Sequence, residues 1–225
     1  MCYETSRRSD TCEAAGDVRV VGSTQTVYVD SLDREWKTKP YARYHDPVAM
    51  AHVREYTLKP LPAAAAPACT RNHSVPGFLF SNSGFSGNLY HDYTDVLVPL
   101  FISTHQFRGR VQFLLSGMKP WWVGKFTPFF KQLTKYDVID VDNDQEVHCF
   151  PWIVVGATFH KDMGVDPRRS HSPYEGEGRS LTEATAFVPN VTECYIQMTL
   201  RFFGGILWSG KVLMVFFGYG DLSML

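Results

Sequence analysis

Apolar and polar positions follow two different periods between residues 75 and 115, and the change of period predicts a strand, a helix and a second strand. Residues 75–80 carry a short apolar run of strand type, which the glycine-rich stretch 81–88 interrupts. Apolar residues then recur at intervals of three and four over 89–101, which gives a helix one apolar face. Residues 111–115 are strand-like again. Such a unit is the building block of a parallel sheet.

The same reading continues downstream. Residues 121–136 predict a second helix, because large apolar side chains recur at threes and fours, and Pro128 is expected to kink or split it. Residues 138–141 and 153–157 are predicted strands. The resulting order of strands and helices, β-α-β-α-β-β, indicates an open sheet of the α/β class.

The remainder of the chain divides at changes of composition. Two short strands around the turn at Gly22 and a stretch near residues 48–56, helix or strand, precede a proline- and alanine-rich segment at 58–67. We therefore expect a β-rich N-terminal appendage and linker over 1–67, an α/β half-domain over 68–172 and a divergent, irregular tail over 173–225. An apolar stretch in that tail is interrupted by two cations and five glycines, which argues against a membrane span.

Net charge, cysteine spacing and sequons bear on the partners and the cellular compartment of the protein. The net charge of −1 gives no electrostatic reason to expect nucleic acid or an anionic membrane as partner. The five cysteines form no CxxC pair, so a zinc site is not expected. Two sequons, at Asn72 and Asn190, favour a secretory, disulfide-permissive compartment. Cys2 with Cys12 and Cys69 with Cys149 are candidate disulfide pairs, although the sequence leaves the connectivity open.

The polar residues of the first helix form the best candidate site. Asn88, His91 and Asp95 are spaced three and then four apart, so they share one stripe at the helix start. His91 can exchange a proton near neutral pH, and Asp95 can hold its tautomer. Asn88 and Asp92 can bind a hydroxyl-rich ligand. The ordinary alternative is that Asn88 is the N-cap of the helix, His91 is its N3 residue and Asp95 is a solvated carboxylate.

Three further features have both a functional and a structural interpretation. The run Asp140-Val141-Asp142-Asn143-Asp144 contains two DxD triplets, which can hold a divalent cation or simply form a turn. Gly84–Gly87 before the helix can cradle a phosphate or make a tight turn. Trp121 and Trp122 place adjacent indoles near a strand end, where one can face a ligand or both can pack on the sheet.

Several long blocks then resemble, in the correct order over residues 1–172, the ectodomain of plant glycosyltransferase family 61. This family includes xylan arabinosyl- and xylosyltransferases. The matching blocks are RRSDTCEAAGDVRV, KTKPYARYHDPVAMAHVREYTLK, CTRNHSVPGFLFS, GNLYHDYTDVLVPLFIS, VQFLLSGMKPWWVGKF, YDVIDVDNDQEVHCFP and GATFHKDMGVDP.

The resemblance implies a Golgi membrane protein with its catalytic region in the lumen and a two-domain GT-B-type fold, of which this chain is the Rossmann-like N-terminal half. It implies transfer of a sugar, most often a pentose, from a UDP-sugar to a xylan-type glycan, with no required metal cofactor. His91 and Asp95 match the family's Asn-x-x-His-x-x-x-Asp pattern as active-site residues, and Asn88, Asp92 and Trp121 are the expected acceptor-binding residues.

The resemblance ends near Ser172. The second domain, which holds most of the nucleotide-sugar site in that family, and the N-terminal anchor are not found in this sequence. We therefore expect a truncated enzyme, and the alternative function is a catalytically inactive fragment that at most binds glycan or a partner.

Overall fold

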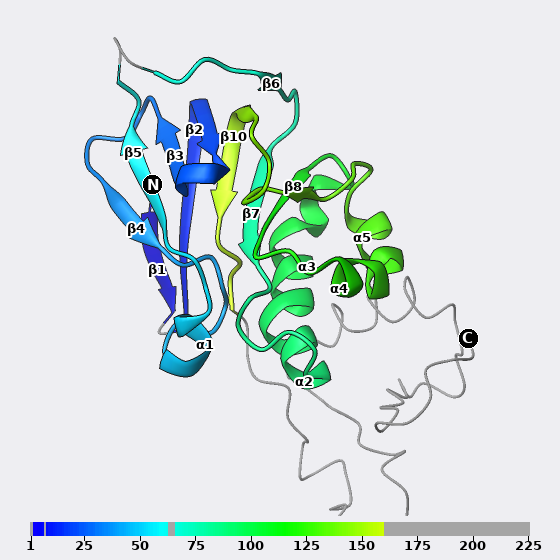
Figure 1. Ribbon diagram of the computed structural model, residues 1–225. Coiled ribbons are helices and arrows are strands. Elements are labelled where there is room, and N and C mark those ends of the chain that lie inside the picture. The colour runs from blue at the N-terminus through cyan, green and yellow to red at the C-terminus, as the bar shows by residue number, and fades with distance from the viewer. Residues whose placement is uncertain (1, 7, 63–65, 160–225) are drawn as a thin grey trace, which may run out of the picture. The chain divides into compact units, whose positions relative to one another are not determined.

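The computed structural model describes residues 2–6, 8–62 and 66–159, and these form a mixed α/β fold on a ten-stranded sheet (Figure 1). The strands are β1 (Cys2–Ser6), β2 (Ser9–Val21), β3 (Thr26–Val29), β4 (Trp36–Thr38), β5 (Tyr56–Pro60), β6 (Arg71–Asn72), β7 (Gly77–Ser81), β8 (Gln112–Ser116), β9 (Ile139–Asp140) and β10 (Val147–Val155). The helices are α1 (Pro47–Ala51), α2 (Leu89–His91), the π-helix η2 (Asp92–Leu97), α3 (Val98–Thr104), α4 (Pro120–Lys125) and α5 (Thr127–Leu133), with 3₁₀ turns η1 (Gly22–Thr24) and η3 (His105–Phe107).

One half of the sheet is parallel and contains the predicted β-α-β-α-β-β order. The strands lie in the order β10-β7-β8-β9, and each neighbouring pair is parallel. The helix from α2 through α3 connects β7 to β8, and α4 with α5 connects β8 to β9. The predicted split of the second helix is confirmed, since α4 ends at Lys125 and α5, with Pro128 in its first turn, begins at Thr127. The α/β class is thus confirmed.

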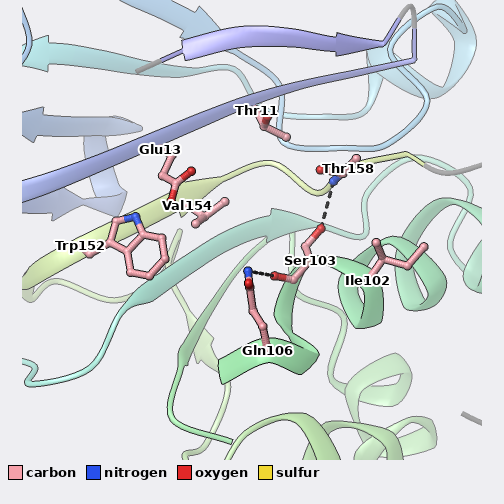
Figure 2. A pocket seen from close by; sticks show the side chains of 8 residues that line it. All are labelled: Thr11, Glu13, Ile102, Ser103, Gln106, Trp152, Val154 and Thr158. Atoms are coloured by element: carbon pink, nitrogen blue, oxygen red, sulfur yellow. Dashed lines mark hydrogen bonds between the residues drawn. The ribbon is translucent and has the colours of Figure 1, made fainter. Parts of the chain in front are cut away.

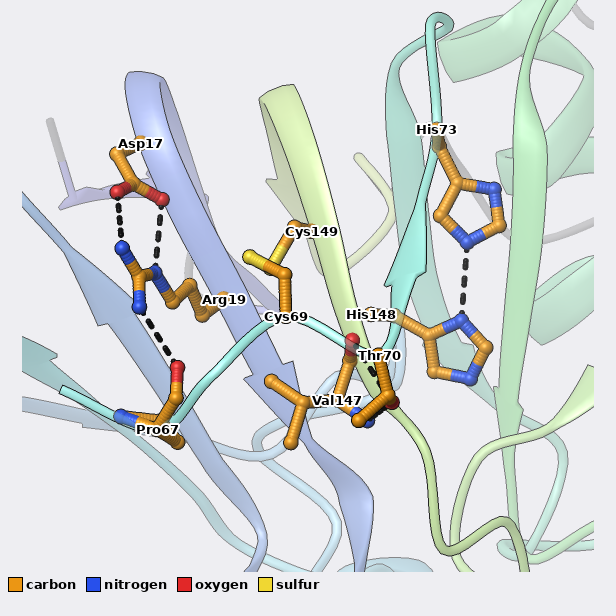
Figure 3. The surroundings of a disulfide bond; sticks show 9 residues. All are labelled: Asp17, Arg19, Pro67, Cys69, Thr70, His73, Val147, His148 and Cys149. Carbon is orange, nitrogen blue, oxygen red and sulfur yellow. Dashed lines mark hydrogen bonds and ion pairs between the residues drawn. A yellow bond between two sulfur atoms is a disulfide. The ribbon is translucent and has the colours of Figure 1, made fainter.

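The N-terminal segment differs from its expectation as a separate appendage. The long strand β2 pairs antiparallel with the central strand β10 along almost its whole length, and β3, β5 and β4 extend the same sheet outward. Residues 1–160 accordingly form one compact unit. The proline- and alanine-rich stretch joins two strands of one sheet, and its last carbonyl, that of Pro67, accepts a hydrogen bond of 2.7 Å from Arg19 on β2 (Figure 3).

Burial on the two faces of the sheet explains why this half belongs to the core. Alternate residues of β2 point inward and pack with inward residues of β10 in one cluster, whose members include Cys12, Ala14, Val18, Val20, Phe150, Ile153 and Val155. Aromatic residues form the core under the helices, with edge contacts between Phe78, Phe113 and Phe130 and the fully buried Trp122 beside them. Each apolar face is therefore covered by a different part of the chain.

Two disulfides cross-link the sheet, Cys2–Cys12 between β1 and β2, and Cys69–Cys149 between the segment before β6 and β10 (Figure 3). Both are pairs that the sequence analysis considered. The sequon residue Asn72 is exposed on β6. Asn190 and the predicted tail over 173–225 lie outside the described residues.

Candidate active site

The site begins where the chain leaves β7. The carboxyl ends of β7 and β8 are joined by a hydrogen bond of 3.1 Å that the Ser81 hydroxyl donates to the Ser116 carbonyl. The loop after β7 ends at the exposed residue Asn88, whose side-chain oxygen accepts a hydrogen bond of 3.1 Å from the Tyr90 N–H. Asn88 is therefore the N-cap of α2, and its side-chain oxygen is already bonded to a backbone N–H of the helix.

His91 and Asp95 lie together one turn further on. The ring nitrogen Nδ1 of His91 is 2.9 Å from Oδ2 of Asp95. Asp95 lies in the π-helix η2, a wider helical form that is frequent at functional sites. Since a carboxylate only accepts hydrogen bonds, Nδ1 is the donor in this pair, and the neutral imidazole in this arrangement has its lone pair on Nε2. His91 keeps 17% of its side chain exposed, so a solute can reach the ring.

Two residues from the N-terminal half hold the Asp95 carboxylate. The Tyr41 hydroxyl donates to Oδ2 at 3.0 Å, and Nη1 of Arg43 donates to Oδ1 at 3.2 Å. The Asp95 side chain is completely buried. Burial raises the pKa of Asp95 above its usual value, and the charge of Arg43 opposes this rise. Burial likewise raises the pKa of Tyr41, so its hydroxyl stays protonated and able to donate.

Tyr41 and Arg43 were not predicted from the sequence, because the loop that carries them is more than 40 residues from His91 in the chain. The glycine at position 84 is the one local feature of the sequence that is connected with Tyr41. A Cβ atom at that position would overlap the Tyr41 ring, so the absence of a side chain makes room for the phenol. The Phe85 N–H also donates to the Tyr41 hydroxyl, at 3.3 Å.

Asp92 occupies a different environment from the one expected for an acceptor-binding residue. Its carboxylate is fully buried and accepts hydrogen bonds from the Gly87 N–H at 3.0 Å and the Trp122 indole N–H at 2.7 Å. Lys125 lies 3.8 Å from its other oxygen. Asp92 therefore fastens the loop after β7 to α4 through Oδ1, whereas its buried Oδ2 has no hydrogen-bond partner and only Lys125 nearby within the described residues.

The two adjacent tryptophans divide between surface and core. Trp121 is 54% exposed at the start of α4, whereas Trp122 is fully buried. Trp121 lies over Gly87, where an added Cβ would be 3.2 Å from its ring. Tyr90 is also exposed, and its ring meets the His91 ring edge-on at 5.2 Å. Exposed aromatic surface therefore lies on both α4 and α2 beside the loop that leads to His91.

Several backbone N–H groups of the glycine-rich loop and its flanks donate hydrogen bonds to acceptors within the protein. Besides the amides of Phe85 and Gly87, the Ser83 N–H donates to the Ser81 hydroxyl at 3.1 Å and the Asn88 N–H to the Phe85 carbonyl at 3.1 Å. These amides are occupied by protein acceptors, and this geometry favours the tight-turn interpretation over a phosphate cradle.

The acidic run after β9 likewise bonds within the fold. The buried Asp142 carboxylate accepts from the Tyr56 hydroxyl at 2.6 Å, the Gly117 N–H at 2.6 Å and the Ser116 hydroxyl at 3.0 Å. In the part of the chain that the structure describes, no group of three or more His, Cys, Asp or Glu side chains is placed to hold a metal ion. The geometry favours the structural interpretation of this run, and metal-independent catalysis stays a prediction.

These features define a mixed α/β protein with a His–Asp pair that can accept a proton from a bound hydroxyl. No protein-family model matches the chain. The chain is 38% identical over 179 residues to the α-1,3-arabinosyltransferase XAT3 and 41% identical over 175 residues to the β-1,2-xylosyltransferase XAX1, both from Oryza sativa subsp. japonica. It is 32% identical over 193 residues to the xylan glycosyltransferase MUCI21 of Arabidopsis thaliana.

The alignments to XAT3, XAX1 and MUCI21 cover 77%, 74% and 81% of this chain but only 31%, 31% and 38% of the relatives. The chain is thus a homologue of plant xylan arabinosyl- and xylosyltransferases, and its resemblance to glycosyltransferase family 61 is confirmed. It spans about a third of the length of these relatives. Among the described helices, none has the length and apolar character that crossing a membrane requires.

Proposed function

We propose that this chain forms the acceptor side of a glycosyltransferase site that transfers a sugar, a pentose in the first instance, from a UDP-sugar to a xylan-type glycan. The observation that carries the proposal is the pairing of His91 with the buried Asp95 at 2.9 Å. The activities for which the relatives are named, arabinosyl and xylosyl transfer, support the choice of reaction.

His91 acts as the general base in this proposal. Its Nε2 takes the proton of the acceptor hydroxyl while that oxygen forms a bond to the anomeric carbon of the donor sugar. The bond from this carbon to the diphosphate breaks at the same time, and UDP leaves with the electron pair. Asp95 keeps the lone pair on Nε2 and stabilises the imidazolium that forms. A positioned general base contributes about 10²–10⁴-fold to the rate.

Residues around the His91–Asp95 pair hold Asp95 in place and can contact the acceptor sugar. Tyr41 and Arg43 hold Asp95 and thereby the orientation of the His91 ring. Trp121 offers an exposed indole face against which the apolar C–H face of a sugar ring can pack, and the exposed Asn88 can bond a sugar hydroxyl. Asp92 acts on the acceptor only indirectly, because it joins the loop after β7 to helix α4.

Fold and compartment belong to the same proposal. The parallel strands β10-β7-β8-β9 with their connecting helices are compatible with the Rossmann-like half of a GT-B enzyme, whose second domain would bind most of the nucleotide. Two disulfides suit the oxidising lumen of the secretory pathway, and we place the protein on the lumenal side of the Golgi membrane.

The test is an assay of the chain with UDP-arabinose or UDP-xylose and xylan oligosaccharides. His91→Ala should abolish product formation, whereas His52→Ala, which removes an exposed imidazole at the end of α1, should leave it unchanged. Turnover by the wild type that folded His91→Ala retains in full would remove His91 from the mechanism.

A second candidate function is non-catalytic glycan binding, because the chain spans only about a third of its relatives. Binding of xylan oligosaccharides without any turnover, and without measurable affinity for the UDP-sugar, would favour this alternative. Sub-millimolar affinity of the chain for the nucleotide-sugar would count against it.

A further inference from the structure

A groove lies at the far end of the helix that begins at α2 (Figure 2). It runs between α3 with η3 on one side and strands β2 and β10 on the other, and encloses about 220 Å³. Its lining residues are Thr11, Glu13, Ile102, Ser103, Gln106, Trp152, Val154 and Thr158. Ile102 follows His91 by eleven residues, which is about 16 Å along a helix, so this groove is separate from the candidate active site.

The groove contains a polar group without a protein partner. Thr11 is 4% exposed, and its hydroxyl makes no hydrogen bond within the described residues. An unbonded hydroxyl at this depth costs stability that a valine of the same shape would not. Ser103 accepts a bond of 3.1 Å from the Thr158 N–H and keeps its own hydroxyl hydrogen for a further acceptor.

The strand side of the groove, which carries Thr11, also carries an aromatic ring. Trp152 is half-buried on β10, and its ring is held edge-on against Phe107 at 5.3 Å. Figure 2 shows Trp152, Thr11, Glu13 and Gln106 around one space. The groove therefore combines an indole surface with the Thr11 and Ser103 hydroxyls and the Gln106 side-chain amide, whose Nε2 donates to the Ser103 carbonyl at 3.4 Å. A sugar ring is complementary to this lining, because its apolar C–H face can pack on the indole and its hydroxyls can bond to the polar groups.

The volume of the groove limits the size of the ligand that it can hold. Pockets for drug-sized ligands usually hold about 300–1,000 Å³, so a cavity of about 220 Å³ suits one sugar unit and is too small for a nucleotide-sugar. We infer that this groove is a second glycan subsite, which holds one pentose unit of the polysaccharide acceptor away from the unit that reacts at His91. This inference rests on the proposed function for the choice of glycan.

The test uses the indole N–H signals of the ¹⁵N-labelled chain, titrated with xylohexaose. The chain has five tryptophans, and the signals of Trp121 and Trp152 are assigned from Trp121→Phe and Trp152→Phe. We expect the Trp152 signal to shift with saturation. A shift of the Trp121 signal alone would overturn the second subsite and leave the proposed function standing. A shift of Trp152 alone would support the subsite and remove glycan binding near His91, while no shift of either would overturn both.

Thr11→Val separates recognition from folding. The substitution removes the unbonded hydroxyl and keeps the shape, so we expect an unchanged or higher unfolding temperature together with about 2- to 12-fold weaker binding of xylohexaose at Trp152. Trp152→Ala should weaken binding about tenfold or more. Tyr136→Ala, which removes an aromatic ring that is 41% exposed elsewhere, serves as the matched control. Unchanged affinity in Thr11→Val and Trp152→Ala would overturn the inference.

Discussion

At the scale of single residues, the two members of the candidate pair have unequal environments. His91 is partly exposed, whereas Asp95 is completely buried and receives hydrogen bonds from three side chains. A group without exposed surface cannot take a proton from a bound sugar directly. Asp95 is therefore a positioning residue, and its effect on any reaction passes through the tautomer and orientation of His91.

This assignment predicts the behaviour of Asp95→Asn. The amide presents an N–H as well as an oxygen to the ring, so the preference for a proton on Nδ1 is lost, and we expect turnover to fall by about 10²–10⁴-fold. The tautomer itself is measurable from the ¹⁵N shifts of the His91 ring, independently of activity. Tyr41→Phe removes one donor but keeps the carboxylate, so its effect should be smaller. An unchanged His91 tautomer in Asp95→Asn would contradict the assignment.

Asp142 makes the complementary case of a carboxylate that serves stability. It accepts hydrogen bonds from β5, β8 and the turn after β8, and its side chain is almost fully buried. Asp142→Ala leaves three buried donors without an acceptor, so we expect the free energy of unfolding to fall by about 3 kcal/mol or more. Denaturant unfolding measures this. Asn143→Ala, at the exposed neighbouring position, should change it by less than about 0.5 kcal/mol.

At the scale of elements, the junction of β6 with β10 contains a pair of histidines that cannot both be charged. Nε2 of His73 is 2.9 Å from Nδ1 of His148 (Figure 3). The other ring nitrogen of His148 lies 3.2 Å from Asp144. Burial, together with the charges of His148 and Arg71, lowers the pKa of His73 to about 4. The His73 ring also stacks on Phe150 at 4.3 Å. The neutral form of His73 is therefore the form that packs at this junction.

The sign of the pH dependence follows from this lowered pKa. Between the pKa of an unfolded histidine, near 6.5, and about 4, the unfolded chain binds the extra proton and the folded chain does not. The contribution of His73 to the free energy of unfolding is thus complete above pH 6.5 and is lost as the pH falls toward 4. Urea unfolding at pH 7, 5.5 and 4.5 should show the decline. His73→Gln should flatten it, and an equal slope in wild type and His73→Gln would exclude this cause.

The sequence predicted elements well wherever their pattern is local. The helix over 89–101 and the strands on either side follow from periodicity alone, and Pro128 marked the break between α4 and α5. The length of β2 and its pairing with β10 could not be predicted from the sequence, because pairing between strands more than a hundred residues apart leaves no local signature. The site divides in the same way: His91 and Asp95 share one helical turn, but Tyr41 and Arg43 meet them only through the tertiary fold.

At the scale of the whole molecule, the N-terminal segment is part of the framework of the candidate site. Its strands extend the sheet from β10, and its loop at Tyr41 and Arg43 reaches the carboxylate behind His91. A division at residue 67 would therefore separate Asp95 from two of its three side-chain partners. The described part of the chain is best treated as one structural and functional unit.

The two disulfides test this unity, because they close loops of very different length. Cys2–Cys12 spans ten residues, whereas Cys69–Cys149 spans 80 and links the segment that follows the N-terminal strands to the central strand β10. In the chain-entropy model, which sets an upper value, the long loop stabilises by about 4.5 kcal/mol and the short one by about 3 kcal/mol. Cys69→Ala/Cys149→Ala should therefore lower the free energy of denaturant unfolding more than Cys2→Ala/Cys12→Ala. The reverse order would indicate that β6 and its flanking segment contribute little to the folding of the sheet.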